Sequence, residues 1–355
     1  MTSESRPIQR PPYAKTLAIN LHGQLSHVLR RRFVELLRPG DLVVANDAAT
    51  LPASLSGEHL PTGKSIEVRL AGRRTLDRED IEAFLAIVFG AGDFHTPTEK
   101  RPLPPRLAAG DRLLLGPLRA EVKRPLCHPR LVSLRFEGTP DSFWAGLARY
   151  GRPIQYAHVP TPLALWEVWT PLAGPAVAFE SPSAGFALDW QTLAAFRARG
   201  IAFGTITHAA GISSTGDERL DCCLPFAEAY RIPQTTALAI ARTKADRGRI
   251  VAIGTTVVRA LEQAASRDGM VRPGDALATQ RIDANSRLRV VDAVLTGVHE
   301  RGSGHYELLR AFASDRTLQR AHDALEANCY RSHEFGDSVF VEVDCQAGLG
   351  ESSGS

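Results

Sequence analysis

The stretch that decides the fold of this chain is Arg249-Ile-Val-Ala-Ile-Gly254-Thr255-Thr256-Val-Val-Arg259-Ala-Leu-Glu262. Residues 250–253 form a β-branched run typical of a buried strand, and residues 257–265 have a helical composition, so the chain passes from strand to helix at Gly254. The first N–H groups of a helix, together with the hydroxyls of Thr255 and Thr256, suit an anionic or polyhydroxylated ligand. A well-capped helix without a ligand would use the same residues.

Sequence patterns typical of strands and of helices alternate on both sides of a region whose hydrophobic pattern is different. The strand signals are residues 17–21, 41–45, 176–179, 202–206, 250–253, 290–295 and 339–343. The helix signals are residues 34–37, 141–150, 189–199, 233–246 and 305–313. This alternation predicts a layered α/β domain.

The region between them predicts a small antiparallel β-barrel. Its short alternating runs, separated by Gly and Pro turns, are residues 65–70, 84–89, 112–115, 118–122 and 131–136. We therefore expect an α/β main domain formed by residues 1–51 and 139–355, with a barrel domain inserted at 52–138. The polar ends of the chain, residues 1–12 and 348–355, are expected to be disordered.

The composition is that of an ordinary soluble protein. The 355 residues are 44% hydrophobic and 23% charged, and a net charge of +3 is compatible with RNA without requiring it. No run of about 18 apolar residues predicts a membrane span. The cysteines, Cys127, Cys222, Cys223, Cys329 and Cys345, show no metal-ligand spacing, and the sequence starts without a signal-like apolar stretch. We expect a cytoplasmic protein without a metal.

Polar signals recur where the predicted strands end. They are Asn46-Asp47, Pro182-Ser183-Ala184-Gly185, His208, Gly254-Thr255-Thr256, Thr296-Gly297-Val298-His299 and Gly336-Asp337. Each alone has a structural explanation, such as a turn, a cap or a histidine bound to a backbone carbonyl. Their common position is the edge at which open α/β sheets bind ligands. Two histidines at that edge could act as acid and base near neutral pH.

Arg259 and Glu262 lie three residues apart on the predicted helix, so they share a face. They could pair with each other, or Arg259 could hold a carboxylate of a ligand. The sequence contains no G-x-G-x-x-G, no G-x-x-x-x-G-K-[ST] and no H-E-x-x-H. Hydride transfer, P-loop phosphoryl transfer and zincin hydrolysis therefore lose support.

From about residue 17 to residue 343, the ordered motifs resemble those of the S-adenosylmethionine:tRNA ribosyltransferase-isomerases of queuosine synthesis. The matching stretches are Leu37-Arg-Pro-Gly-Asp-Leu-Val-Val-Ala-Asn46-Asp with Leu51-Pro-Ala-Ser-Leu, Gly63-Lys-Ser-Ile-Glu67-Val, Pro182-Ser-Ala-Gly185, Ile253-Gly-Thr-Thr-Val-Val-Arg259-Ala-Leu-Glu262, Val291-Asp-Ala-Val-Leu-Thr-Gly-Val-His299, and Tyr330-Arg331 followed by Gly336-Asp337-Ser-Val-Phe340. The strand–Gly-Thr-Thr–helix stretch is the most specific of them.

The resemblance implies an α/β domain with an inserted barrel. It also implies a transferase and isomerase that moves the ribosyl part of S-adenosylmethionine onto 7-aminomethyl-7-deazaguanine in tRNA, giving epoxyqueuosine, adenine and methionine. S-adenosylmethionine is then a co-substrate, and no further cofactor is implied. The implied catalytic residues are His208, His299, Glu228 and Asp337. The implied substrate-binding residues are Asn46, Ser183, Gly185, Gly254, Thr255, Thr256, Arg259, Glu262, Tyr330 and Arg331.

This chain departs from the family pattern at several polar positions. Ala187 and Phe226 stand where the family has histidines, and Gly297 stands where it has an asparagine. Arg301 and Gly304 replace a proline and a threonine, and His208 is followed by Ala-Ala-Gly-Ile-Ser-Ser. Such replacements predict an altered acceptor site with donor binding retained.

Two alternatives to the family reaction remain open at this point. One is an enzyme that cleaves or rearranges S-adenosylmethionine with a small-molecule acceptor or with none. The other is a non-catalytic relative that binds a nucleoside or RNA. The expected partners are S-adenosylmethionine and either tRNA or a small molecule, and we expect a monomer.

Overall fold

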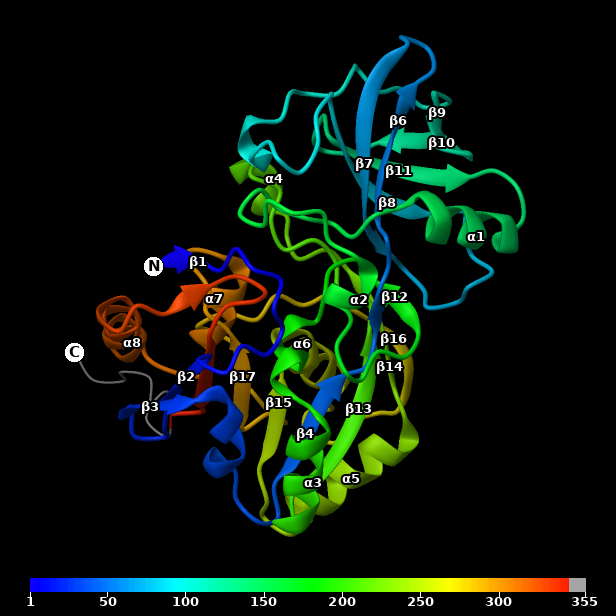
Figure 1. Cartoon of the computed structure of the whole chain (residues 1–355). Coiled ribbons are helices and arrows are strands. Elements are labelled where there is room, and N and C mark those ends of the chain that lie inside the picture. Colours follow the sequence, from blue (N-terminus) through cyan, green and yellow to red (C-terminus); the bar gives the residue numbers. More distant parts are fainter. Residues whose placement is uncertain (345–355) are drawn as a thin grey trace, which may run out of the picture.

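The computed structural model describes residues 1–344 as two packed units, a barrel and an α/β unit (Figure 1). The expected disorder of residues 348–355 lies outside the described residues. The predicted fold class, a layered α/β domain with an antiparallel barrel, is confirmed. None of the helices in residues 1–344 is both long and apolar enough to cross a membrane.

The α/β unit is built on a sheet of nine strands in the order β16-β14-β13-β4-β15-β17-β19-β2-β3. Their bounds are β2 (Lys15–Ile19), β3 (Leu25–Leu29), β4 (Leu42–Asn46), β13 (Ala202–His208), β14 (Glu228–Ile232), β15 (Ile250–Ile253), β16 (Gly274–Ala278), β17 (Ala293–Gly297) and β19 (Ser338–Glu342). Strands β13, β4, β15 and β17 run parallel to one another. Strand β19 is antiparallel to β17.

Helices bury both faces of the central strands. Along β4, Leu42 and Val44 pack into the core formed with α5 (Gln234–Ala245), α6 (Thr255–Ala264), α7 (Gly304–Leu309) and α8 (Asp315–Ala327). Val43 and Ala45 pack on the opposite side with η1 (Arg30–Leu36) and α3 (Trp190–Ala198). Burial of both faces explains why the central strands read as continuous apolar runs.

Six antiparallel strands close the barrel in the order β10-β11-β8-β7-β6-β9. They are β6 (Ser54–His59), β7 (Lys64–Arg73), β8 (Phe84–Phe89), β9 (Arg112–Leu115), β10 (Leu118–Pro125) and β11 (Leu131–Phe136). Strand β6 is missing from the sequence-based expectation because its sequence, SLSGEH, lacks clear apolar alternation. The remaining short elements are β1 (Thr2–Ser3), β5 (Ala49–Thr50), β12 (Ala176–Ala178), β18 (Arg331–Ser332), α1 (Pro140–Tyr150), α2 (Leu165–Val168), α4 (Glu218–Asp221), η2 (Thr98–Lys100) and η3 (Ser183–Ala187).

The N-terminal segment is ordered, so the expected disorder of residues 1–12 is wrong. Strand β1 pairs with β18, and Glu4 is buried against Arg331. The Gln9 side-chain amide donates hydrogen bonds to three backbone carbonyls around α2. These partners are distant in sequence, so local composition gives no sign of them.

Two predicted helices also differ from the structure. The stretch 34–37 is the end of the 3-10 helix η1, which begins earlier, at Arg30. The helix predicted over 305–313 is α7, which ends at Leu309. The apolar residues that follow it, Phe312 among them, are buried in the core outside regular structure.

Candidate functional site

A cavity of about 200 Å³ opens where the four parallel strands of the central sheet end. Asn46 and His208 are the last residues of β4 and β13. Gly254 follows β15, and Gly297 ends β17. The parallel strands therefore bring four segments that are distant in sequence to one edge, as expected for ligand sites of open α/β sheets.

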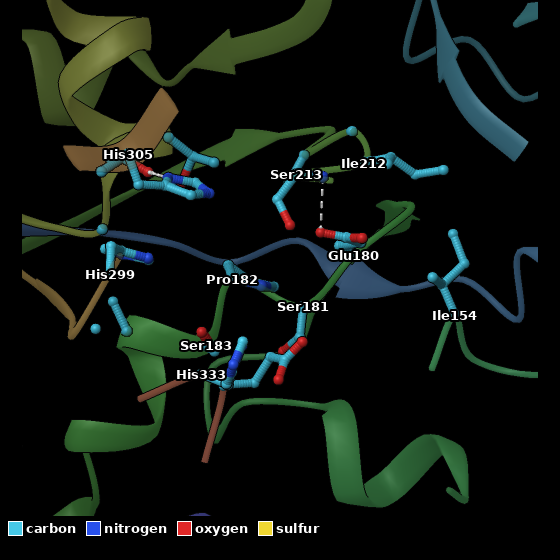
Figure 2. Close-up of a pocket in the computed structure, with 18 of the residues that line it drawn as sticks. Ile154, Glu180, Ser181, Pro182, Ser183, Ile212, Ser213, His299, His305 and His333 are labelled. Atoms are coloured by element: carbon cyan, nitrogen blue, oxygen red, sulfur yellow. Dashed lines mark hydrogen bonds between the residues drawn. The ribbon is translucent and has the colours of Figure 1, made fainter. Parts of the chain in front are cut away.

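Two groups of residues with different chemistry line this cavity. The sheet-edge group consists of Glu228, Gly254, Thr255, Thr256 and Arg259. The loop group consists of Tyr156, His158, Glu180, His333 and Glu334, which come from irregular segments. Figure 2 shows His299 and His305 on one side of the cavity and the Glu180–Ser213 hydrogen bond on another.

The strand-to-helix junction at Gly254 has the conformation that the sequence predicts. Gly254 is the N-cap of α6 with φ +94°, a value that favours glycine, and a Cβ there would meet the Ala184 side chain at 3.4 Å. Its own N–H donates to the Leu295 carbonyl at 2.8 Å. Thr255 and Thr256 follow as the first residues of the helix, so the positive end of α6 meets the cavity.

His208, Glu228 and Arg259 form a buried network beside the junction. His208 Nε2 lies 2.8 Å from Glu228 Oε2, and the Arg259 guanidinium pairs with the same carboxylate. The Gly211 N–H donates to the other oxygen of Glu228 at 2.6 Å. The three side chains belong to β13, β14 and α6, so sheet order and helix packing place them together. The possible Arg259–Glu262 pair is not formed.

Asn46 fixes the backbone of His208. Its side-chain oxygen accepts the His208 N–H at 2.9 Å, and its amide donates to the His208 carbonyl at 2.9 Å. Asn46 is only 2% exposed and does not line the cavity. It supports the network from behind, while Glu228 and Arg259 reach the cavity surface.

The environment of His208 differs from the neutral-pH acid or base that the sequence predicts. Burial, and then the charge of Arg259, lower the pKa of His208 to about 3. Its Nδ1 lies 2.8 Å from the Thr256 carbonyl, which can only accept a hydrogen bond, so Nδ1 carries a hydrogen. Nε2 faces the Glu228 carboxyl at 2.8 Å. Both ring nitrogens are therefore occupied within the protein.

His299 and His305 stack on each other with ring centroids 4.4 Å apart. His299 Nε2 lies 2.9 Å from the Thr296 hydroxyl, and His305 Nδ1 lies 2.9 Å from the Thr255 hydroxyl. Burial lowers the pKa of His299 well below its usual range, and it lowers that of His305 to about 4. Both rings are neutral at pH 7, so the expected titration of His299 near neutral pH is also wrong.

In the loop group, Glu180 has only neutral hydrogen-bond partners. The Tyr156 hydroxyl donates to one oxygen, and the Ser213 N–H donates to the other at 3.0 Å. Within residues 1–344, no Lys, Arg or His forms an ion pair with Glu180. Burial is the main cause that raises the pKa of this carboxyl to about 7, and the charge of Glu334 adds to it.

The remaining predicted residues divide into those at the cavity and those that hold the framework. Ser183 lines the cavity, whereas Gly185 packs against Thr170. The Glu262 carboxylate accepts three backbone N–H groups, those of residues 289, 290 and 291. Asp337 accepts the N–H groups of Lys15 and Arg331.

Tyr330 is fully buried against Lys15 and His27, away from the cavity. The Arg331 side chain pairs with Glu4. Of the departures from the family pattern, Gly297 and Gly304 line the cavity, whereas Ala187 and Phe226 do not. Five residues that were expected to contact a substrate or to act in catalysis therefore do not line the cavity: Asp337, Glu262, Gly185, Tyr330 and Arg331.

Sequence reasoning missed the whole loop group and His305. Tyr156 and Glu180 lie in segments without hydrophobic periodicity, and His333 and Glu334 follow a strand of only two residues. The one available signal is that Ser183 and His299, both predicted, stand within a few residues of Glu180 and His305.

The sequence and the fold match known proteins. The sequence profile of the family described as "Queuosine biosynthesis protein" matches residues 2–341, and the chain belongs to this family. A curated relative from Pelobacter propionicus, named S-adenosylmethionine:tRNA ribosyltransferase-isomerase, is 32% identical over 90% of each chain. A relative of the same name from Symbiobacterium thermophilum is 29% identical over 95% of each chain.

The fold also matches a solved structure. A crystal structure of S-adenosylmethionine tRNA ribosyltransferase from Thermotoga maritima covers 95% of each chain with a TM-score of 0.50. Its sequence is 21% identical, so this likeness concerns the fold.

Proposed function

We propose that this chain is a transferase and isomerase that uses S-adenosylmethionine as a ribosyl donor for a 7-deazaguanine base in tRNA. Family membership and the names of the relatives support this reaction. The observation that carries the proposal is the cavity at the ends of β4, β13, β15 and β17, lined by the Gly254–Thr256 junction and by Arg259. Anionic and hydroxylated groups bind well at such a helix start.

The donor is proposed to lie over the Gly254–Thr256 junction. Its ribose hydroxyls or carboxylate would meet the positive end of α6 and the two threonine hydroxyls. Arg259 supports this placement, because its buried Nε has no hydrogen-bond partner within residues 1–344 although the side chain lines the cavity. A ligand oxygen would supply the missing acceptor.

The proposed chemistry begins with the sulfonium, which acidifies the neighbouring C5′ protons. Removal of one proton, loss of adenine, bond formation between the acceptor's aminomethyl nitrogen and the ribosyl part with loss of a proton from that nitrogen, closure of a carbon ring, and epoxide formation with expulsion of methionine would complete the reaction. We assign proton removal to His299, because its ring is neutral at pH 7 and lines the cavity. Glu228 and Arg259, positioned by His208 and Asn46, would orient the donor.

A small-molecule acceptor is the second candidate. It is favoured by Gly297 and Gly304, small residues at the cavity where the family pattern has polar or bulkier ones. We further propose a cytoplasmic monomer in which residues 52–138 form the inserted domain.

The test is to incubate the purified protein with S-adenosylmethionine, with and without tRNA that carries the aminomethyl deazaguanine base. Adenine and methionine are assayed, together with transfer of label from the donor ribose to tRNA. Release that requires the tRNA, with label incorporated, supports the family reaction. Release of adenine and methionine without tRNA would show that the acceptor is a small molecule or that none is needed. Binding of the donor without release would show that the protein is a non-catalytic relative.

A further inference from the structure

Three metal-ligating side chains of the loop group lie together. The imidazoles of His158 and His333 and the carboxylate of Glu334 each offer a ligand atom, and these atoms lie within 4.8 Å of one another. His158 Nε2 is 3.1 Å from Glu334 Oε2, and the two imidazole rings stack with centroids 4.2 Å apart. All three residues line the cavity, and His333 is labelled in Figure 2.

The segments that carry these ligands are held in place from behind. The Gln155 amide donates to two backbone carbonyls of the first segment, those of residues 159 and 161, at 2.7 Å each. In the second segment the buried Phe335 ring stacks on Phe186 with centroids 5.7 Å apart. His333 has φ +69°, a left-handed conformation that is strained for a histidine and is more frequent at functional sites.

We propose that His158, His333 and Glu334 form a binding site for a divalent first-row transition metal ion, with Zn²⁺ as the best match. Two imidazoles and one carboxylate are a donor set that zinc uses in sites that keep a position open for another ligand. Tetrahedral bonds of about 2.0–2.2 Å place ligand atoms roughly 3.4 Å apart, so the His158–Glu334 pair at 3.1 Å is already close enough, and the remaining ligand atoms need to approach by at most about 1.4 Å. The open position would face the cavity.

The charge around the cluster favours a cation. Glu180 lies in the same cavity, and it has no ion-pair partner among the described residues. A bound divalent ion would offset the charges of Glu180 and Glu334 together. In the cavity it would offer its open position to an oxygen or nitrogen of the bound ligand.

The expectation of a protein without a metal depended on local ligand spacing. His158 and His333 lie in opposite halves of the chain and meet only because both segments border the same cavity. Spacing rules find sites built within one segment, so they do not detect a site assembled from two.

The test uses the full chain with its cysteines alkylated and with no S-adenosylmethionine present, so its outcome does not depend on the proposed function. Zn²⁺ is titrated by calorimetry, and Co²⁺ is titrated by visible absorption as a probe of coordination geometry. We expect one equivalent to bind. His333→Ala and the isosteric Glu334→Gln should each weaken binding by about 100-fold or more, since each removes one of three protein ligands.

The matched control is His322→Ala, which removes a second His–Glu contact, 3.6 Å long, on α8 outside the cavity. This variant should bind the metal as the unaltered chain does. Circular dichroism verifies that each variant is folded, and the isosteric Glu334→Gln serves as the ligand variant if His333→Ala does not fold. The proposal is overturned if the unaltered chain binds no stoichiometric metal, or if Glu334→Gln and His322→Ala bind as tightly as it does.

Discussion

The sheet-edge group and the loop group line one cavity, but they differ in how their charges are satisfied. In the sheet-edge group, Glu228 receives hydrogen bonds from Arg259 and from the Gly211 N–H and contacts His208. In the loop group, Glu180 receives hydrogen bonds from neutral donors only. The residues of the first group lie on or next to strands and a helix, whereas those of the second group lie on irregular segments.

The two groups therefore differ in whether the protein itself supplies a positive partner for the buried carboxyl group. The Glu228 carboxylate is paired with a guanidinium and a backbone N–H without a ligand, which rigidifies the edge of the sheet, and Arg259 Nε keeps one N–H without a partner among the described residues for a ligand. A carboxyl with a raised pKa and no cation is incomplete until a ligand or ion supplies charge. Donor recognition shared with the family is therefore expected at the sheet-edge group, and features specific to this chain are expected at the loop group.

The largest effect is expected when the sheet-edge network is broken. Arg259→Met would leave the Glu228 charge buried without its guanidinium partner, because Glu228 is 4% exposed. Breaking such a pair lowers the free energy of unfolding by about 3–5 kcal/mol. Urea denaturation followed by circular dichroism measures this loss.

Arg310→Met is the control for removal of an arginine, because Arg310 pairs with Glu307 and Asp315 at the surface of the molecule. It should change stability little. Equal stabilities of the two variants would contradict a charge-complete network around Glu228. The double variant Arg259→Met/Glu228→Gln should recover part of the loss, since it leaves no buried charge unpaired.

The second prediction concerns proton removal by His299. His299→Ala should lower adenine release by roughly 100-fold, the usual scale for a lost general base, and should change the melting temperature little. The base must be neutral, and burial lowers its pKa, so the rate of the unaltered enzyme should fall only as the pH drops well below 6.5. Rates of adenine release between pH 4 and pH 8 measure this.

An early-melting His299→Ala variant that keeps full activity would show that this histidine is structural. A rate that already halves near pH 6.5 would contradict the lowered pKa. His322→Ala, on α8, is the control that should leave both the rate and its pH dependence unchanged.

The third prediction tests the placement of the donor. Thr255→Val combined with Thr256→Val removes two hydroxyls at the start of α6 and should weaken S-adenosylmethionine binding by roughly 30-fold, since each of two hydrogen bonds contributes about 1 kcal/mol. Calorimetry measures the affinity. Thr236→Val is the control, because Thr236 lies on α5 outside the cavity and its hydroxyl donates to the Thr205 carbonyl on β13. Unchanged affinity in the folded double variant would exclude this placement.

Sequence was a good guide to the sheet-edge group because its signals are local. A β-branched run followed by Gly254 predicts the turn from strand to helix, and the parallel strands then bring Asn46 and His208 to the same edge. The partner of Arg259 was not predictable in this way. Glu228 reaches Arg259 because β14 lies next to β13, and that strand order is a property of the whole sheet.

The loop group was not predictable for a related reason. Tyr156, Glu180 and Glu334 belong to segments without a period of 2 or 3.6, so no pattern indicates where their side chains lie. The pKa shifts of His208 and His299 could not be predicted either. Burial causes them, and burial depends on packing between segments, which the sequence of one segment does not reveal. Strand β6 was missed because its exposed polar residues hide its pairing with β7 and β9.

The smallest expected effect tests the incomplete charge of the loop group. Burial raises the pKa of Glu180 from 4.5 to about 7, so the folded protein holds this proton more tightly than the unfolded chain. The resulting stabilisation is full below pH 4.5 and is lost as the pH rises through 7. Glu180→Gln keeps the hydrogen-bond acceptor and removes the titration, so its stability relative to the unaltered chain should rise with pH. Solvent access to Glu180 reduces the difference between pH 5 and pH 8 to about 1 kcal/mol.

Urea denaturation of both proteins at pH 5 and pH 8 measures this difference. Glu79→Gln, which removes an exposed carboxylate between β7 and β8, controls for the general loss of negative charge. Its stability relative to the unaltered chain should be nearly the same at the two pH values. If Glu180→Gln behaves like Glu79→Gln, then Glu180 is ionised without penalty in the folded protein, and the contrast between the two groups disappears. If the difference appears and Zn²⁺ removes it, the charge that the loop group lacks is the charge that the proposed ion would supply.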